Sequence, residues 1–387
     1  MTFSQESPPD CAVPEPGVRR GRDPSTAPPG RDPLALGESQ ELFLWRATGG
    51  GDPYWLPRGL TLLRVIEGGL RAWLEAAGYA EIRTPPMVGG AFRAGTCAAH
   101  RLVHALARRA EDGPLRLFEL GVCHRGGPGE GLLGGAAFTT DEAHVFCPAD
   151  HCVAEVARIV TASAATLAAF GFPVIGVRWG TARAGEECPL AAGARRAGYQ
   201  PVFAVGPAGE GAPTGGSWLV FEVDDGAGGS WPCGGITLEG DAIGGAGERP
   251  ILLCHRLFGS LEAAVGLLLA RGDGWLAPWL APQQVLLAGA GAEEAIVRSI
   301  AGRFAEAGLR VGADLGAEAL GVKLARARAL GIPVVASLGP REAFSKTVTL
   351  SWPDDRKETL YIEAALARLS AFCAVPAPPG RNRAPAA

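Results

Sequence analysis

The chain has 387 residues, of which 47% are hydrophobic, and this is enough to fill the cores of two domains. A formal net charge of −4 gives no global electrostatic reason to expect nucleic-acid binding. The only lysines are Lys323, Lys346 and Lys357, so a phosphate-binding loop of the Gly-Lys-Ser/Thr type is excluded from the rest of the chain.

The cysteine count and the first residues of the chain predict a cytoplasmic location. There are nine cysteines, an odd number, at irregular spacings. The N-terminus has no cationic segment followed by an apolar run, and no uninterrupted apolar stretch of about 18 residues is available to span a bilayer. We therefore expect reduced thiols, a cytoplasmic location and no membrane partner.

Both ends of the chain are predicted to be disordered tails. Residues 1–40 are rich in proline, glycine and charge, and they hold too few large apolar groups to offset the entropy of ordering. Residues 374–387 have the same character. The sequence between the tails divides into a first unit, residues 41–280, and a second unit, residues 281–373.

The first unit is predicted to be a strand-dominated α+β domain. Apolar residues recur at helical spacing in the segments 59–77, 151–170 and 257–270. The segments 116–125 and 218–225 alternate as antiparallel strands do. Glycine-rich loops separate these segments, which argues against a regular alternation of parallel strands and helices.

The second unit shows the opposite pattern, in which strands alternate with helices. Helical spacing occurs at 293–307, 318–330 and 358–372, and the strings VLLAG, LRVGADL, PVVASLG and TVTLSW lie between or before them. This alternation predicts a compact α/β domain with a mostly parallel sheet.

Six strings along residues 42–372 carry a resemblance to a known family. They are GYAEIRTPPM, PLRLFELGVCHR, FTTDEAHVFC, SWPCGGITLEGD, RPILLCHRLFGSLE and the segment from WLAPQQVLLA to PVVASLG. In this order they resemble the class II aminoacyl-tRNA synthetases of the threonyl type, without that family's editing region. The resemblance implies an α+β fold with a class II antiparallel sheet flanked by helices, followed by a small α/β anticodon-binding-type domain. It also implies a homodimer with Pro85 at the interface, although the apolar stripe of residues 59–77 is equally typical of an internal helix.

The resemblance assigns a zinc site to Cys97, His144 and His255. Their spacing alone forms no metal motif, and an isolated buried cysteine or histidine usually has a packing role. Each of the three, however, falls where the family has a zinc ligand. One thiolate and two imidazoles would leave an open tetrahedral position, which the family uses to bind the amino group and hydroxyl of threonine. Such a zinc ion can also polarise a bound group or activate water.

The positions that hold ATP in the family are largely replaced. Arg125 matches the arginine that contacts the α-phosphate, and it is the one catalytic residue that we predict. Gly127 stands in place of the glutamate that reads adenine, and Gly134, Ala136 and Ala263 stand where the family has arginines. Losing one such cation costs roughly 2–4 kcal/mol of transition-state stabilisation. The replacements therefore argue against ordinary use of ATP.

The residues that the resemblance places in the amino-acid pocket also depart from the family. Glu142 and Thr140 stand where the family has aspartate and glutamine, whereas Cys233 and Ser260 are retained. We therefore expect a small amino acid as the ligand, and it need not be threonine.

Positions in the second unit that the family offers to tRNA are also altered. Gly316, Ala317 and Ser351 replace two arginines and an asparagine, and base recognition requires such side chains. Arg326 and Arg328 remain available for phosphate contacts, although a solvated helix face is the ordinary role for them. These replacements argue against sequence-specific tRNA recognition.

Three functions are open at this point. The favoured one is a threonyl-synthetase paralogue with a zinc-anchored pocket for a small hydroxy- or amino-substituted amino acid, which it binds or transforms, and with ordinary aminoacylation lost. The second is an ATP-dependent ligase that activates an amino acid for tRNA or another acceptor. The third is a non-catalytic pseudo-enzyme or amino-acid sensor.

Overall fold

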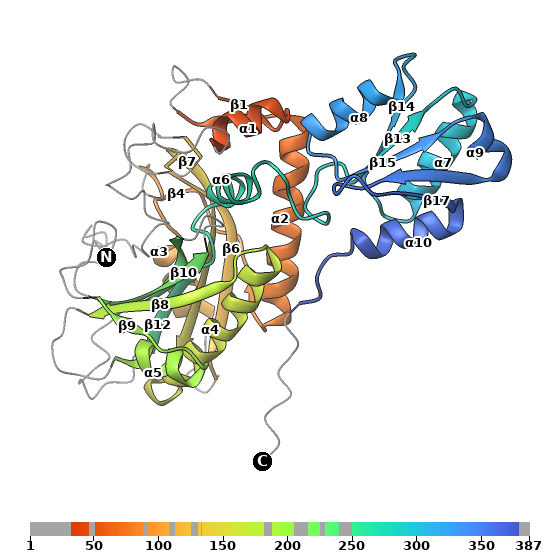
Figure 1. Cartoon of the computed structure of the whole chain (residues 1–387). Coiled ribbons are helices and arrows are strands. Elements are labelled where there is room, and N and C mark those ends of the chain that lie inside the picture. Colours follow the sequence, from red (N-terminus) through yellow and green to blue (C-terminus); the bar gives the residue numbers. More distant parts are fainter. Residues whose placement is uncertain are drawn as a thin grey trace.

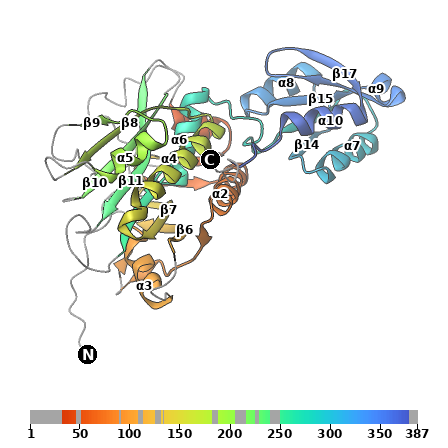
Figure 2. The same ribbon diagram turned by 90° about the horizontal axis from the view of Figure 1, so that it is seen from below.

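The computed structural model describes residues 32–45, 51–88, 91–107, 113–124, 131–132, 134–181, 188–204, 216–224, 229–239 and 250–378. Figures 1 and 2 show two units side by side, a core unit and a C-terminal unit drawn in blue, with the long helix α2 (Pro57–Ala76) at their boundary. Arg58 in the first turn of α2 joins the units, because its guanidinium donates to the carbonyl of Leu330 at 2.6 Å and to Oε1 of Gln283 at 3.3 Å.

The core unit is built on an eight-stranded sheet. Its order is β3 (Ala80–Glu81), β6 (Leu115–His124), β7 (Ala137–Cys147), β12 (Ile251–Arg256), β11 (Ser230–Glu239), β10 (Ser217–Asp224), β8 (Val174–Thr181) and β9 (Val202–Phe203). Neighbouring strands run antiparallel except for the two edge pairs, β3 with β6 and β8 with β9. This confirms the strands predicted at 116–125 and 218–225.

The two faces of this sheet differ in what covers them. The helix face carries Phe118, Ala143 and Leu253 and belongs to one large apolar core. It packs against α2, α4 (Cys152–Ala169), α5 (Pro189–Arg196) and α6 (Leu261–Gly272). The opposite face, called here the α3 face, carries a smaller apolar group of Leu117, Phe146 and Leu252, next to α3 (Cys97–Ala107).

The predicted helices at 59–77 and 151–170 are confirmed as α2 and α4. The helix predicted at 257–270 begins later, at Leu261, because the chain first completes β12 and a short loop. Ser260 then caps α6, since its hydroxyl accepts a hydrogen bond from the amide of Ala263 at 3.0 Å.

Helix α1 (Pro33–Ser39) lies at the end of the region that composition predicted to be disordered. Asp32 caps it by accepting from the amide of Leu34 at 2.9 Å, and proline occupies its first turn. Gly37 is packed beneath the ring of Phe43. The remaining short elements are β1 (Phe43–Trp45), β2 (Pro53–Trp55), β4 (Met87–Val88), β5 (Ala91–Phe92) and a 3-10 turn (Ala149–His151). Residues 1–31 and 379–387 lie outside the described part of the chain.

The segment Ala149–Ala169 is long and apolar enough to cross a membrane by length and composition alone. This stretch was not predicted from the sequence. Half of the segment, 50%, is buried inside the fold, where α4 packs on the helix face and on α5. This is the packing of a core helix.

The C-terminal unit has a mixed five-stranded sheet instead of the mostly parallel one predicted. Its order is β14 (Val311–Asp314), β13 (Val285–Gly289), β15 (Val334–Leu338), β16 (Thr347–Ser351) and β17 (Lys357–Tyr361), with helices α7 (Glu294–Glu306), α8 (Leu320–Ala329), α9 (Pro340–Ser345) and α10 (Ile362–Phe372). The first three strands are parallel, whereas β16 and β17 form an antiparallel hairpin. Residues 358–361, predicted as the start of a helix, belong to β17 of this hairpin.

Candidate metal centre

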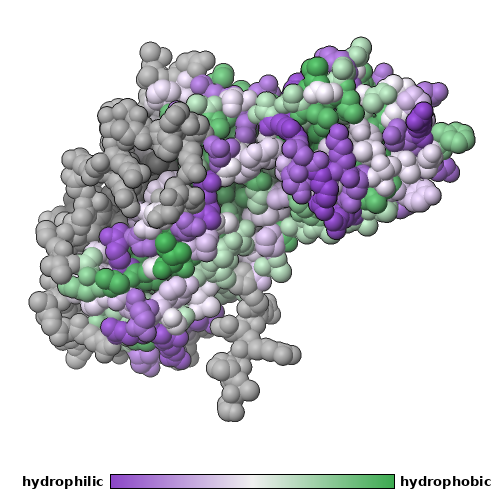
Figure 3. Space-filling view, in the orientation of Figure 1, coloured by the Kyte–Doolittle hydropathy of each residue, from purple (hydrophilic) through white to green (hydrophobic). Residues whose placement is uncertain are grey.

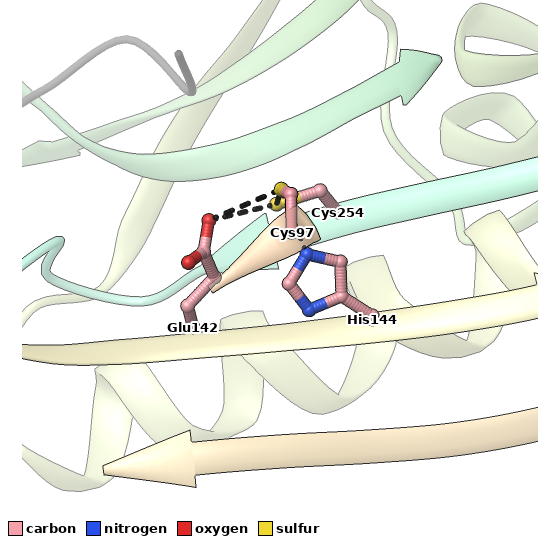
Figure 4. Close-up of side chains that lie close together, drawn as sticks. All are labelled: Cys97, Glu142, His144 and Cys254. Carbon is pink, nitrogen blue, oxygen red and sulfur yellow. Dashed lines mark hydrogen bonds between the residues drawn. The ribbon is translucent and has the colours of Figure 1, made fainter. Parts of the chain in front are cut away.

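Four buried side chains converge on the α3 face of the core sheet (Figure 4). They are Cys97, Glu142, His144 and Cys254, and the atoms that could bind a metal all lie within 4.8 Å of one another. Cys97 begins α3, Glu142 and His144 come from β7, and Cys254 comes from β12. The group is therefore assembled from three separate segments of the chain.

Strand geometry explains why these residues meet. Side chains two positions apart on a strand share a face, so Thr140, Glu142 and His144 all lie on the α3 face of β7. The register of β7 with β12 then places Cys254 directly opposite His144. Cys97 completes the group from above the sheet, since α3 packs against β7.

The distances within the group are short. Sγ of Cys97 lies 2.9 Å from Nε2 of His144 and 3.7 Å from Sγ of Cys254. Sγ of Cys254 lies 3.2 Å from Oε1 of Glu142. Two thiols and one imidazole form a soft donor set that suits zinc, and catalytic zinc sites of the Cys₂His type keep a fourth position open.

The carboxylate of Glu142 has partners on both oxygens. Oε2 accepts from the amide and the hydroxyl of Thr96, each at 2.6 Å, and Oε1 accepts from Nη2 of Arg256 at 2.6 Å. Burial alone would raise its pKa, but Arg256, the nearby His144 and the Thr96 hydrogen bonds outweigh burial and hold the pKa of Glu142 well below its usual range. Glu142 is therefore an ionised group whose position is fixed by the protein.

His255, which the sequence predicted as a metal ligand, is not brought to this group. Consecutive residues of a strand face opposite sides, so Cys254 faces the metal group and His255 faces the helices. Nε2 of His255 lies 2.8 Å from the hydroxyl of Tyr79, and burial and then His144 lower the pKa of His255 to about 3. The ligand set that the structure offers is therefore corrected from Cys97, His144 and His255 to Cys97, His144 and Cys254.

A second buried carboxylate lies beside the first, because Glu119 of β6 stands opposite Glu142 of β7. It accepts hydrogen bonds from Arg93 at 2.7 Å, from the hydroxyl of Thr84 at 2.7 Å, and meets Nε2 of His100 at 3.2 Å. Burial raises the pKa of Glu119, but these hydrogen bonds prevail and lower it to about 2. Sequence reasoning missed this network, although the alternation of β6 places Glu119 on the same face as Leu117.

The other predicted pocket residues are distributed differently. Thr140 lies on the α3 face, and its buried hydroxyl has no hydrogen-bond partner among the described residues. Cys233 belongs to the helix-face core, where its thiol donates to the carbonyl of Leu257 at 3.4 Å. Ser260 acts as the cap of α6. Arg125, the predicted catalytic residue, lies outside the described part of the chain, as does Gly127.

A local irregularity of β11 explains the position of Cys233. Gly234 has φ +63°, and a Cβ atom there would lie 2.3 Å from the carbonyl oxygen of Arg256. Only glycine fits this conformation and this close approach. The glycine therefore allows the backbone of β11 to approach the backbone of β12 closely at Arg256.

At the other end of β7, carboxylates bind backbone amides. Asp52 accepts from the amides of Ala136 at 2.7 Å and Ala137 at 3.2 Å. Glu262 accepts from the amide of Thr139 at 3.0 Å. Ala263 has a side chain that is 2% exposed and offers no charge. In the described part of this end, these three backbone amides are therefore engaged by carboxylates.

The cationic side chains of α8 in the C-terminal unit are paired. Arg326 forms an ion pair with Asp314, and Arg328 forms one with Asp355. Lys323 is buried and donates to the carbonyls of Gly289 at 2.8 Å and Gly316 at 2.6 Å. Figure 3 shows a hydrophilic area on the side of this unit that adjoins the core unit. The ion pairs show that the charges of α8 and its neighbours are of both signs, which is not the pattern of a basic surface for nucleic acid.

Comparison with known proteins agrees with this architecture. The tRNA synthetase class II core domain (G, H, P, S and T) matches residues 91–246, and the anticodon binding domain matches residues 284–372. The threonine–tRNA ligase of Phenylobacterium zucineum is 32% identical over 83% of this chain. The chain carries the core and anticodon-binding domains of the class II tRNA synthetases and is similar to threonine–tRNA ligases. A second relative, the threonine–tRNA ligase of a Caulobacter species, is 30% identical over 92% of this chain.

The chain spans only 56% and 62% of the length of those two relatives. The solved RNA binding domain of threonyl-tRNA synthetase from Cryptosporidium parvum has a TM-score of 0.78 at 20% identity, over 88% of this chain and 98% of that one. A putative threonyl-tRNA synthetase from Aeropyrum pernix has a TM-score of 0.72 at 17% identity, over 88% and 96%. These structures confirm the class II fold predicted from the sequence.

Proposed function

We propose that the protein is a threonyl-tRNA-synthetase paralogue in which Cys97, His144 and Cys254 hold a zinc ion. With these three ligands a zinc ion would keep one position open, which would suit a small hydroxy- or amino-substituted amino acid. The observation that carries the proposal is the convergence of two thiols and an imidazole beside a carboxylate that already has its own partners. Bound zinc would supply a Lewis acid that grips an amine or a hydroxyl.

The state of Glu142 supports an open position. The Glu142 carboxylate is already neutralised by Arg256 and held by Thr96, and breaking a buried ion pair is costly. We therefore assign the metal to the two thiolates and the imidazole, and we give Glu142 a positioning role.

Thr140 supports a ligand on this face of the sheet. Its hydroxyl is buried and has no hydrogen-bond partner in the described part of the chain. Buried polar groups are normally satisfied, so a ligand or an ordered water must lie against it. We propose that the ligand's hydroxyl or carboxylate meets Thr140.

The proposal includes the loss of ordinary aminoacylation. Support comes from Asp52 and Glu262, whose carboxylates occupy the amides of Ala136, Ala137 and Thr139. Adenylate formation requires positive groups where charge develops on the phosphates, and among the described residues neither Ala136 nor Ala263 supplies one. Residue 263, an arginine position in the family, is a buried alanine.

We also propose, from the family relationship, that the chain acts as a homodimer in the cytoplasm. The anticodon-binding-type unit would then contribute a fold without the side chains that read bases, since Gly316, Ala317 and Ser351 offer few groups for hydrogen bonding. Loss of specific tRNA recognition is therefore part of the proposal.

Calorimetric titration of amino acids into protein of known zinc content tests the proposal. The panel is serine, threonine, 2,3-diaminopropionate and valine, which lacks the hydroxyl but keeps the shape of threonine. We expect one zinc per chain and binding of at least one hydroxy- or amino-substituted member at least tenfold more tightly than valine. Purified protein without stoichiometric zinc, or equal binding of valine, would contradict the proposal.

The second candidate is an ATP-dependent ligase, and the presence of both synthetase domains favours it. The third candidate is a non-catalytic amino-acid sensor, which the metal group fits equally well. The cellular phenotype of a folded Cys97→Ser variant distinguishes a metal-dependent sensor from a protein that acts through its binding surfaces. If the cellular phenotype is unchanged without the metal, the surfaces carry the function.

A further inference from the structure

A cavity outside the metal group lies on the helix face of the core sheet, between the end of α2 and the middle of α4. Its volume is about 480 Å³, and it is lined mainly by apolar side chains, namely Trp73, Leu74, Ala76, Ala77, Ile159, Ala162 and Leu257. A volume of this size lies within the range of sites for small organic molecules, roughly 300–1,000 Å³. The small side chains of the alanines leave the space open.

Two polar groups meet inside this cavity. The hydroxyl of Tyr79 lies 2.8 Å from Nε2 of His255, and both residues line the cavity. His255 is 4% exposed, and its second ring nitrogen, Nδ1, has no hydrogen-bond partner among the described residues. A buried nitrogen without a partner is unfavourable, so a molecule that satisfies Nδ1 would be stabilised there.

The remaining polar side chains do not call for a charged ligand. The hydroxyls of Thr161 and Thr166 donate to carbonyls of their own helix, at 2.9 Å and 2.8 Å. Arg158 is the charged residue among the described ones that line the cavity, and its side chain is 51% exposed at the mouth. Its guanidinium donates to the carbonyl of Ala77 at 3.1 Å. Ser163 also lines the cavity. Among these lining residues, His255 is the one with a buried side-chain nitrogen that has no partner in the described part of the chain.

We propose that this cavity binds a neutral, mostly apolar small molecule that carries one hydroxyl or carbonyl group, which hydrogen-bonds to Nδ1 of His255. An aromatic ring or a branched alkyl group would lie against Trp73, Ile159 and Leu257. The site is separate from the metal group, since Cys254 and His255 face opposite sides of β12. It requires neither zinc nor a nucleotide.

Fluorine NMR titration tests this site with two probes of nearly equal shape. 4-Fluorobenzyl alcohol carries the hydroxyl that His255 would bind, and 4-fluorotoluene lacks it. We expect saturable binding of the alcohol to the full chain at least fivefold tighter than that of the toluene. His255→Leu should abolish the preference, whereas Ala162→Leu, which fills the cavity, should weaken both probes at least tenfold.

Zinc content is measured on each variant, because unchanged zinc shows that the sheet and its other face are intact. Equal affinity of the two probes for the unaltered chain would overturn the proposal, as would undiminished binding to Ala162→Leu. Sedimentation at two protein concentrations supplies a further check. Binding that appears only when a dimer dissociates would assign the cavity to a subunit interface instead of a ligand.

Discussion

The two ends of strand β7 are held in opposite ways. At the end that carries Glu142 and His144, side chains bind side chains, and the group is closed by Arg256 and Cys254. At the end near Ala137, the described contacts are carboxylates on backbone amides. The first arrangement depends on residue identity at every position. The second arrangement is compatible with almost any side chain at those positions, because the donor is a backbone amide.

The proposed function accounts for this difference. A metal group needs particular donors, so such a group is expected where the donors have a use. At the other end, Asp52 and Glu262 hold backbone amides, and residue 263, an arginine position in the family, is a buried alanine. Changes at the two ends should therefore have different effects.

The largest effect on zinc content is expected at Cys254, which was not predicted as a metal ligand from the sequence. Cys254→Ala removes one of three zinc donors, so zinc per chain should fall from about one to near zero after dialysis. His255→Ala is the matched control, since it changes the neighbouring residue on the other face of β12 and should leave zinc near one. Elemental analysis of both variants decides the point. Zinc lost from His255→Ala and kept by Cys254→Ala would restore the ligand set predicted from the sequence.

The next largest effect is expected on the free energy of unfolding, when the buried ion pair between Arg256 and Glu142 is broken. Arg256→Ala leaves the Glu142 carboxylate without its cation, and such a change costs about 3–5 kcal/mol of stability. The double variant Arg256→Met with Glu142→Met removes both charges and should regain most of that loss. Urea unfolding of the variants measures the free energy of unfolding. A loss of under about 1 kcal/mol for Arg256→Ala would show that Glu142 does not depend on Arg256.

The pKa of Glu119 predicts a pH dependence. The folded state holds this pKa at about 2, below the ordinary value of 4.5, so the unfolded state binds more protons between these values. The stabilisation, about 3 kcal/mol, is complete above about pH 5 and is lost as the pH falls toward 2. The stability difference between the unaltered protein and Glu119→Gln should therefore shrink between pH 6 and pH 3. A difference that is constant over this range would refute the assignment.

The smallest effect is expected at the end of β7 near Ala137. Asp52→Ala removes hydrogen bonds to two partly buried amides, which water can replace, so the cost should be about 1–2 kcal/mol. Zinc content should not change. Urea unfolding together with elemental analysis tests both statements. A loss of zinc in this variant would show that the two ends of β7 are coupled.

The fold was predictable because it depends on long patterns. The apolar spacing of residues 59–77 and the alternation of residues 116–125 each extend over several turns or pleats, so a shift of two residues does not change the element. The hairpin at residues 347–361 was missed as a hairpin, since its second strand is short and exposed and resembles the start of a helix. The helix α1 was missed because composition was averaged over the whole N-terminal region.

The site was less predictable because it depends on register. Cys254 and His255 are adjacent, and both are reasonable metal ligands, but only the pairing of β7 with β12 shows which one faces His144. The same holds for Arg256 and Glu119. Both lie next to Glu142 in the fold, although Arg256 is 114 residues and Glu119 is 23 residues from it along the chain. Spacing along the chain carries no signal for such contacts.

We propose above all that the protein has kept the metal group on β7 and has lost the formation of an adenylate from ATP. Exchange of pyrophosphate into ATP, measured across a panel of amino acids with protein of determined zinc content, tests it most directly. We predict no exchange with any amino acid from protein that carries one zinc per chain. Exchange that depends on an amino acid would contradict the claim, since it would show that the site still forms an adenylate and that the protein is a working ligase.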